Sequence, residues 1–242
     1  MRMNMLSDFH SHILPGIDDG SKTVEESIAL LRLEAEQGVK RVVATPHFYS
    51  NQDTMDGFLA RRNVAVEKLQ QALTAYSDLP QVTCGAEVFY FRGIGRADAL
   101  RKLALEGTHH VMIEMPMGSW TDAMYRDLAE IRQNLGLTPI IAHLDRYLGF
   151  IGSKKILQKL EDLPVLIQAN TSFFLTRQTA RKAMRMLEQE QIHLIGSDCH
   201  NLTTRQPNLA LAAEQICQRW GEPALDWIRQ HEDLVLSDGA CR

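Results

Sequence analysis

The sequence predicts an α/β fold, a distorted TIM-like barrel of seven βα units. Short apolar runs alternate with longer segments of helical periodicity along the 242 residues. Several runs are rich in Val and Ile and are bounded by Gly or Pro, which is typical of buried parallel strands. No repeat, low-complexity tract or Pro/Gly/Ser-rich linker divides the chain. We therefore expect a single domain over residues 1–242.

Seven apolar runs are the candidate strands. They are MLSDF (5–9), VKRVVATPH (39–47), VTCGAEVF (82–89), HVMIEM (110–115), PIIAHL (139–144), PVLIQAN (164–170) and IHLIGSD (192–198). An open doubly wound sheet is the alternative to a barrel. However, no GxGxxG or Walker-type loop follows any of these runs, which argues against nucleotide binding of those kinds.

Segments with helical spacing of apolar residues separate the runs. They cover residues 22–38, 54–77, 97–107, 121–136, 153–162 and 176–190, and two more, about 207–220 and 222–231, close the chain. Gly38, Gly107 and Gly136 follow the last apolar position of three of them, where glycine commonly ends a helix.

Composition limits the kinds of partner. A formal net charge of −4, with 45% apolar and 23% charged residues, argues against a general nucleic-acid or membrane-surface binder. Cys84, Cys199, Cys217 and Cys241 form no CxxC pair and are typical of reduced thiols. Neither a signal-peptide core nor a run of 18 apolar residues is present. We expect a cytoplasmic protein without stable membrane insertion.

Histidine and acidic residues recur at the carboxyl ends of the candidate strands or just after them. The carboxyl ends of parallel barrel strands share one face, so these residues would meet in one pocket. Imidazole and carboxylate together suit Zn, Mn or Fe. We predict a site for two or three divalent ions, with Glu87 as a bridge. The candidate ligands are His10, His12, Asp19, His47, Glu87, Glu114, His143, Asp198 and His200.

Other interpretations of these residues stay open. Buried carboxylates at strand ends also pair with arginine in purely structural networks. Asp18 and Asp19 are suited to a turn before a helix near Thr23, and we assign Asp18 to the turn and Asp19 to the metal. The remaining histidines lie at strand starts or in the terminal helix and are expected to be structural: His109, His110, His193 and His231.

Two arginines stand close to candidate ligands. Arg146 follows His143 by three residues, and Arg205 follows His200 by five. Guanidinium offers a planar fork of donors that matches phosphate, so both are expected to bind a phosphoryl group.

The stretch SDCHNLTTR (197–205) also contains Cys199 and Arg205 at the spacing used by cysteine-dependent phosphatases. Such enzymes need a loop whose backbone N–H groups face the phosphate, and glycine usually permits that turn. No glycine lies between Cys199 and Arg205. Alternation along a strand also directs Cys199 away from Asp198 and His200. We therefore expect Cys199 to be a packing residue.

The motifs FHSHILPGIDDG, ATPH, GAEVFY, IEMP, IAHLDRY and SDCHN…R resemble, in order and spacing, the polymerase-and-histidinol-phosphatase (PHP) metal-dependent phosphoesterases. The likeness covers residues 8 to about 230. Within that group the sequence is most similar to the bacterial tyrosine-protein phosphatases encoded with capsule and exopolysaccharide genes. Two departures are Phe48, where relatives often have a second histidine, and the pair Thr203–Thr204 before Arg205.

The resemblance implies a PHP fold and a cluster of up to three metals, commonly manganese, with iron or zinc as alternatives. It assigns His10, His12, Glu87 and Asp198 to one ion. It assigns Glu87, Glu114 and His143 to a second ion, and Asp19, His47 and His200 to a third. Arg146 and Arg205 fall where the family binds phosphate.

The implied reaction is hydrolysis of phosphotyrosine by in-line attack of a metal-activated hydroxide. The implied partner is the phosphorylated tyrosine-rich tail of a bacterial tyrosine autokinase that regulates polysaccharide synthesis. His200 or Asp19 could deliver a proton to the leaving group. Two alternatives remain: a phosphatase of a small metabolite such as histidinol phosphate, and a catalytically silent metal-binding regulator. The oligomeric state is left open.

Overall fold

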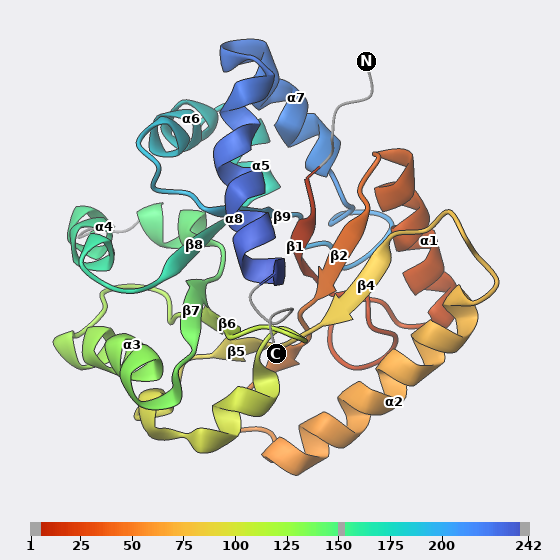
Figure 1. Cartoon of the computed structure of the whole chain (residues 1–242), viewed down its shortest axis with the longest axis horizontal. Helices are drawn as coiled ribbons and strands as arrows, with labels where there is room; N and C mark the ends of the chain where they lie inside the picture. Colours follow the sequence, from red (N-terminus) through yellow and green to blue (C-terminus); the bar gives the residue numbers. More distant parts are fainter. Residues whose placement is uncertain (1–5, 150–152, 238–242) are drawn as a thin grey trace.

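The computed structural model describes residues 6–149 and 153–237, and its centre is a curled sheet of parallel strands (Figure 1). Three strands form one part, in the order β1 (Asp8–Ser11), β2 (Arg41–Ala44) and β4 (Gln81–Cys84). The second part has the order β3 (His47–Phe48), β5 (Glu87–Phe89), β6 (His110–Glu114), β7 (Thr138–Ile141), β8 (Leu166–Asn170) and β9 (Leu194–Gly196).

The first and last strands meet and close the curl. The backbone N–H of His12 donates to the carbonyl of Cys199 at 2.9 Å, and that of Asp198 donates to the carbonyl of His10 at 2.7 Å. Ser11 and Cys199 form an isolated parallel bridge at the same place. The predicted fold class, a distorted barrel of parallel strands, is confirmed.

Two of the seven predicted runs are each broken into two strands. Residues 39–47 contain β2 and the start of β3, with Thr45 and Pro46 between them, because proline has no N–H to give to a ladder. Residues 82–89 contain most of β4 and all of β5, separated at Gly85, where an added Cβ would lie 2.4 Å from the Leu105 side chain. At both breaks the chain passes from one part of the sheet to the other, and this distorts the barrel.

Helices surround the sheet (Figure 1). They are α1 (Val24–Glu36), α2 (Met55–Leu73), α3 (Asp122–Leu135), α4 (Ser153–Glu161), α5 (Thr171–Leu175), α6 (Ala180–Glu188), α7 (Leu209–Trp220) and α8 (Asp226–Ser237). The side chains of Thr23, Thr54 and Thr121 cap the first three of these by accepting an N–H of the first turn. Gly38 and Gly136, which follow α1 and α3, have positive φ, as helix-terminating glycines do. Gly107 also has positive φ but follows no α-helix.

The helix predicted at 97–107 is wrong in type. The chain instead forms the 3₁₀ segments η1 (Ile94–Arg96) and η2 (Asp98–Leu103). The backbone N–H of Leu105 donates to the carbonyl of His110, and that of Glu106 donates to the carbonyl of Cys84. Because these N–H groups bond to residues at strand ends, they cannot make the hydrogen bonds that would continue an α-helix. The pattern at 222–231 is likewise divided, into η4 (Glu222–Leu225) and α8.

The core has two layers. The larger lies between the sheet and the surrounding helices, and the smaller fills the inside of the barrel with Phe9, Val43, Met112, Ile140 and Leu194. Val235 of α8 joins this inner cluster, and α8 crosses the middle of the view in Figure 1. The inner layer therefore fills the barrel beneath the strand ends that carry the predicted ligands. Over the described parts of the chain, no helix is both long and apolar enough to cross a bilayer.

Candidate metal centre

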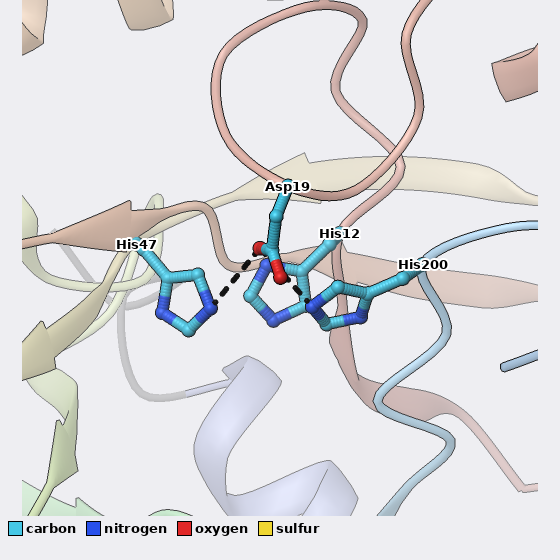
Figure 2. A group of neighbouring side chains, drawn as sticks. All are labelled: His12, Asp19, His47 and His200. Atoms are coloured by element: carbon cyan, nitrogen blue, oxygen red, sulfur yellow. Dashed lines mark ion pairs between the residues drawn. The ribbon is translucent and has the colours of Figure 1, made fainter.

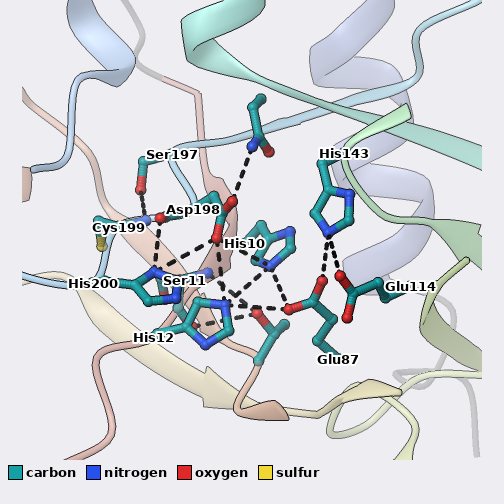
Figure 3. Close-up of polar contacts among 12 residues, drawn as sticks. His10, Ser11, His12, Glu87, Glu114, His143, Ser197, Asp198, Cys199 and His200 are labelled. Atoms are coloured by element: carbon teal, nitrogen blue, oxygen red, sulfur yellow. Dashed lines mark hydrogen bonds and ion pairs between the residues drawn. The ribbon is translucent and has the colours of Figure 1, made fainter. Parts of the chain in front are cut away.

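All nine predicted ligands come together at the carboxyl end of the barrel (Figures 2 and 3). Each belongs to, or closely follows, a parallel strand, except Asp19, which reaches in from the loop between β1 and α1. Ligands separated by almost 200 positions in sequence therefore share one site because parallel strands end on one face.

Glu87, the first residue of β5, lies at the centre of the cluster. Its Oε2 is 3.1 Å from Nε2 of His10 and 3.3 Å from Nε2 of His12. The same oxygen is 3.1 Å from Nδ1 of His47, while Oε1 is 2.7 Å from Nε2 of His143. Glu87 is 1% exposed. One carboxylate thus faces four imidazoles, the geometry expected of a bridging ligand.

The other carboxylates complete the surroundings of these imidazoles. Oδ1 of Asp198 lies 3.6 Å from Nε2 of His10 and 3.4 Å from Nε2 of His12. Oε1 of Glu114, the last residue of β6, is 3.6 Å from Nε2 of His143. His10, His12 and Asp198 therefore form a group next to a second one formed by His47, Glu87 and Glu114.

Asp19 joins two histidines from opposite sides of the site (Figure 2). Its Oδ1 lies 3.4 Å from Nε2 of His47 and 3.3 Å from Nε2 of His200. With His12 these residues form a third group of donor atoms. The Asp19 side chain is 65% exposed, so this group is the one open to solvent.

The donor atoms fit divalent cations. Three buried atoms within the cluster have no hydrogen-bond partner in the described structure: Nδ1 of His47, Oε2 of Glu114 and Nε2 of His200. Nδ1 of His47 is close to Glu87, but not in hydrogen-bonding geometry. Buried polar atoms are otherwise nearly always paired. Nδ1 of His47 and Oε2 of Glu114 lie 4.0 Å apart in one group of donor atoms, and Nε2 of His200 lies beside Asp19 in another. Buried lone pairs without hydrogen bonds are what metal ligands have when the metal is not counted among their partners.

For two of the ligands, Glu87 and His200, the surroundings favour the protonation state that binds a metal. Burial opposes ionisation of Glu87, but the imidazoles of His10, His12 and His143 hold its pKa well below its usual range. Burial and the neighbouring charge of His12 lower the pKa of His200 to about 4. Glu87 is therefore anionic and His200 neutral at pH 7, the forms that bind metals.

Several positioning residues were not predicted from the sequence. Oδ2 of Asp18 accepts from Nδ1 of His12 at 2.8 Å, and its Oδ1 accepts the N–H of Gly20, so Asp18 forms the predicted turn and also orients a ligand. Gln168 lies 3.2 Å from Nδ1 of His10 through its Oε1 and accepts the N–H of His143. Nδ2 of Asn170 donates to Asp198.

One signal for Gln168 and Asn170 was present in the sequence. They are polar residues two apart inside the apolar run 164–170, so they share a face of one buried strand. Such partners fix the tautomer and orientation of metal-binding side chains.

The backbone is also specialised around the ligands. His143 and Asp198 have φ of 32° and 55°, a region that non-glycine residues seldom adopt. An added Cβ on Gly20 would lie 2.1 Å from the carbonyl oxygen of His12, and one on Gly196 would lie 2.5 Å from Cβ of His10. Both glycines are thus required for close approach of neighbouring segments to ligand-bearing backbone.

Arg146 and Arg205 meet on Asp198. Arg146, in η3 (Leu144–Gly149), donates to Oδ2, and Nη2 of Arg205 lies 2.7 Å from Oδ1. Both line a pocket of about 540 Å³ together with Asp145, Asn170, Ser172, Ser197 and the loop residues that precede α7. The side chains of Arg146 and Arg205 are 35% and 36% exposed, and their guanidinium groups give this pocket the donors that a phosphoryl group needs.

Cys199 is excluded from the pocket. It is 0% exposed, and its donor atom groups with the carboxylates of Asp8 and Glu34 instead of the cluster. Burial, together with the charge of Asp8, raises the pKa of the thiol well above its usual value. The predicted packing position is confirmed, and a thiolate there would be strongly disfavoured.

The loop after Cys199 does not form a phosphate cradle. The N–H of His200 donates to the carbonyl of Arg205 at 2.9 Å. Oδ1 of Asn201 accepts the N–H groups of Thr203, Thr204 and Arg205. The backbone donors that a cysteine phosphatase would turn toward phosphate are therefore used within the loop. The hydroxyls of Thr203 and Thr204 donate to the same Asn201 oxygen, which gives both threonines a role in holding the loop.

The histidines expected to be structural stay outside the groups of donor atoms found in the described residues: His109, His110, His193 and His231. Nδ1 of His193 accepts the N–H of Ile167, and Nδ1 of His231 lies 2.8 Å from the carbonyl of Trp227.

Comparison with known proteins agrees with this arrangement. Residues 6–233 match the sequence family "Capsular polysaccharide synthesis, CpsB/CapC". The tyrosine-protein phosphatase CpsB of Streptococcus pneumoniae is 32% identical over 234 residues, covering 88% of this chain and 90% of that protein. CpsB of Streptococcus agalactiae is 31% identical over 230 residues, covering 89% and 91%.

The fold has a solved counterpart. A chain from the crystal structures of YwqE from Bacillus subtilis and CpsB from Streptococcus pneumoniae, described as metal-dependent tyrosine phosphatases, matches with a TM-score of 0.83. The identity is 23%, and the match covers 96% of this chain and 95% of that chain. The likeness extends over almost the entire barrel.

Proposed function

The chain belongs to the CpsB/CapC family of capsular polysaccharide synthesis, and from this we infer that it is a metal-dependent tyrosine-protein phosphatase. The observation that carries the proposal is that nine imidazole and carboxylate side chains and two arginines lie together at one end of the barrel. Such a site suits a phosphomonoester, because the ligands provide for cations and the arginines for the anionic substrate.

We assign the ligands to two or three divalent ions. His10, His12, Glu87 and Asp198 would hold one; Glu87, Glu114 and His143 a second; and Asp19, His47 and His200 a third. Manganese is the ion we propose, with iron or zinc as alternatives, because imidazole and carboxylate without thiolate suit all three. When bound, such ions lower the pKa of coordinated water and neutralise phosphoryl oxygens.

The chain's own residues would bind and orient the phosphoryl group. Arg146 and Arg205 approach Asp198 from two sides, so their guanidinium groups are held at the edge of the cluster before substrate arrives. Donors fixed in advance stabilise charge that develops in a transition state without further reorganisation. A phenol has a pKa of about 10 and leaves readily, so proton delivery by His200 or Asp19 would add little.

The proposed substrate is phosphotyrosine in the tail of a bacterial tyrosine kinase that regulates capsular or exopolysaccharide synthesis. The family to which the chain belongs supports this choice. The proposed location is the cytoplasm, which agrees with the lack of a membrane-crossing helix in the described part of the chain. We further propose that residues 1–242 act as one PHP-type domain.

Chelation tests the mechanism directly. Incubation with EDTA is expected to abolish release of phosphate from a phosphotyrosine peptide, and Mn²⁺ to restore it. Full activity in EDTA would overturn the metal-dependent mechanism, and no phosphate release by metal-loaded protein would indicate a silent regulator. Turnover of the peptide should exceed that of histidinol phosphate; strong preference for the alkyl ester would instead identify a small-metabolite phosphatase.

A further inference from the structure

A groove between α6 and α7 carries an unusual concentration of positive charge. It has a volume of about 680 Å³ and is lined by Ala180, Arg181, Met184, Arg185, Glu188, Gln215, Gln218, Arg219 and Trp220. Three arginines face one glutamate here, in a protein whose formal net charge is −4. The positive charge is therefore local, and it lies on α6 and α7, which both pack against α5.

The guanidinium groups of the groove are available to a ligand. Arg181, Arg185 and Arg219 are exposed and form no ion pair with any described residue; Arg219 lies over the ring of Trp220, 5.5 Å from its centroid. By contrast, Arg146 and Arg205 of the metal centre are both paired with Asp198. Unpaired arginines around a concave surface are suited to carboxylates or phosphates.

The groove and the pocket of the metal centre are both lined by residues of α7. Leu211 lines the pocket that contains Arg146 and Arg205, whereas Gln215, Gln218 and Arg219 line the groove. These positions are four, seven and eight residues after Leu211, so all lie on one face of the helix. At a rise of 1.5 Å per residue, Leu211 and Arg219 are about 12 Å apart along the axis.

The surface between the two sites can carry a peptide. Leu211 is 54% exposed and stands at the rim of the pocket, where it offers an apolar contact. An extended chain advances about 3.3 Å per residue, so roughly four residues span the distance from this rim to Arg219. A polypeptide whose phosphotyrosine occupies the pocket would thus bring a nearby segment over the arginines.

We propose that the α6/α7 groove is a docking site for an acidic segment of the phosphoprotein substrate, roughly four to seven residues from its phosphotyrosine. This inference rests on the proposed function for the phosphotyrosine, and charge complementarity identifies the occupant as aspartate- or glutamate-rich. The groove selects substrates through KM, because Arg181, Arg185 and Arg219 touch no reacting atom.

The test compares phosphotyrosine peptides on the metal-loaded protein. One series carries three Asp residues beginning four residues before or after the phosphotyrosine, and the matched series carries Asn. We expect the Asp peptide of one orientation to have a KM about three- to tenfold lower than its Asn partner, with similar kcat. The difference should shrink as salt is raised, since exposed charges are screened.

The double substitution Arg185→Ala with Arg219→Ala should remove the advantage of Asp over Asn and leave turnover of p-nitrophenyl phosphate unchanged. Arg126→Ala, which removes an exposed arginine on the remote helix α3, is the matched control and should preserve the advantage. Equal KM values in the wild type, or an advantage that survives the double substitution, would overturn the proposal. The proposal would also be overturned if KM fell only when a second phosphotyrosine replaced the Asp residues.

A binding measurement separates this inference from the proposed activity. An Asp-rich peptide without phosphotyrosine, carrying a fluorophore, should bind the wild type more tightly than the double variant when followed by anisotropy. Loss of binding in the variant supports the groove even if no phosphotyrosine peptide is hydrolysed. Equal binding by both proteins would show that the arginines do not recognise acidic peptides.

Discussion

The Nδ1 atom of His12 lies 2.8 Å from Oδ2 of Asp18, which is 6% exposed in its side chain. Nδ1–H therefore donates to the carboxylate, and Nε2 keeps its lone pair for the cluster. The same carboxylate accepts the N–H groups of Gly20 and His47. Asp18 thus fixes both the loop after β1 and the tautomer of a ligand.

Asp18→Asn should weaken metal binding by about 10- to 100-fold, because an amide can present N–H to Nδ1 and move the imidazole proton to Nε2. Titration with Mn²⁺ against a competing chelator measures the change. Asp56→Asn is the control, since that side chain is 93% exposed. An unchanged affinity in Asp18→Asn would show that the contact does not set the tautomer.

Cys199→Ser should keep most of the phosphatase rate, within about threefold, because the thiol is buried beside Asp8 and Glu34 instead of facing the cluster. Replacing a buried thiol by a hydroxyl should cost roughly 1–2 kcal/mol of stability. Steady-state assays and thermal unfolding measure the two effects separately. Loss of all activity in a folded Cys199→Ser protein would contradict this prediction and indicate a cysteine-dependent mechanism.

The positions of the ligands could be predicted because the alternation of strand and helix fixes which ends of the strands share a face. The placement of His10, Glu114 and Asp198 in the site follows from that rule alone. Asp18 could not be assigned beyond its turn, because the contact with His12 depends on the path of the loop. Likewise, the division of two runs at Pro46 and Gly85 depends on which strand each half pairs with.

The charge of the α6/α7 groove shows the same limit. Arg181 and Arg185 are recognisable in sequence as one face of a helix, i and i+4 apart. Arg219 belongs to another helix, and only packing around α5 brings it to the same groove. Patterns within one element were therefore predictable, whereas surfaces formed by two elements were not.

Arg205→Ala should lower kcat/KM for a phosphotyrosine peptide by about 10²-fold, the usual effect of removing one fixed donor to a developing anion. Arg205→Lys should recover only part of the rate, since ammonium lacks the planar fork. Inhibition by inorganic phosphate should weaken in parallel. Arg177→Ala is a matched exposed control, and a normal phosphate inhibition constant in Arg205→Ala would exclude the assigned role.

Gly20→Ala should impair the site without a general loss of fold. The new Cβ would lie 2.1 Å from the carbonyl oxygen of His12 and 2.4 Å from its Cβ, so the loop or the ligand must move. We expect at least a tenfold loss of Mn²⁺ affinity. Gly93→Ala is the control, because an added Cβ there meets nothing within 4 Å, although its φ of 81° adds strain. Equal affinities in both variants would contradict the prediction.

Glu232 should make the protein less stable as pH rises. This residue of α8 is 3% exposed and accepts the N–H of Ser7, and burial raises its pKa to about 8. The unfolded carboxyl, with a pKa near 4.5, loses its proton first, so stability falls between about pH 4.5 and pH 8. Glu232→Gln does not titrate at this position, and the melting temperature of this variant relative to wild type should rise by roughly 7–14 °C between pH 5 and pH 8. Glu214→Gln, on the exposed face of α7, should show no such trend.

Thermal unfolding of metal-loaded protein measures the melting temperature of each variant against pH. Parallel curves of melting temperature for Glu232→Gln and wild type would mean that Glu232 is already ionised in the fold, with the Ser7 N–H offsetting its burial.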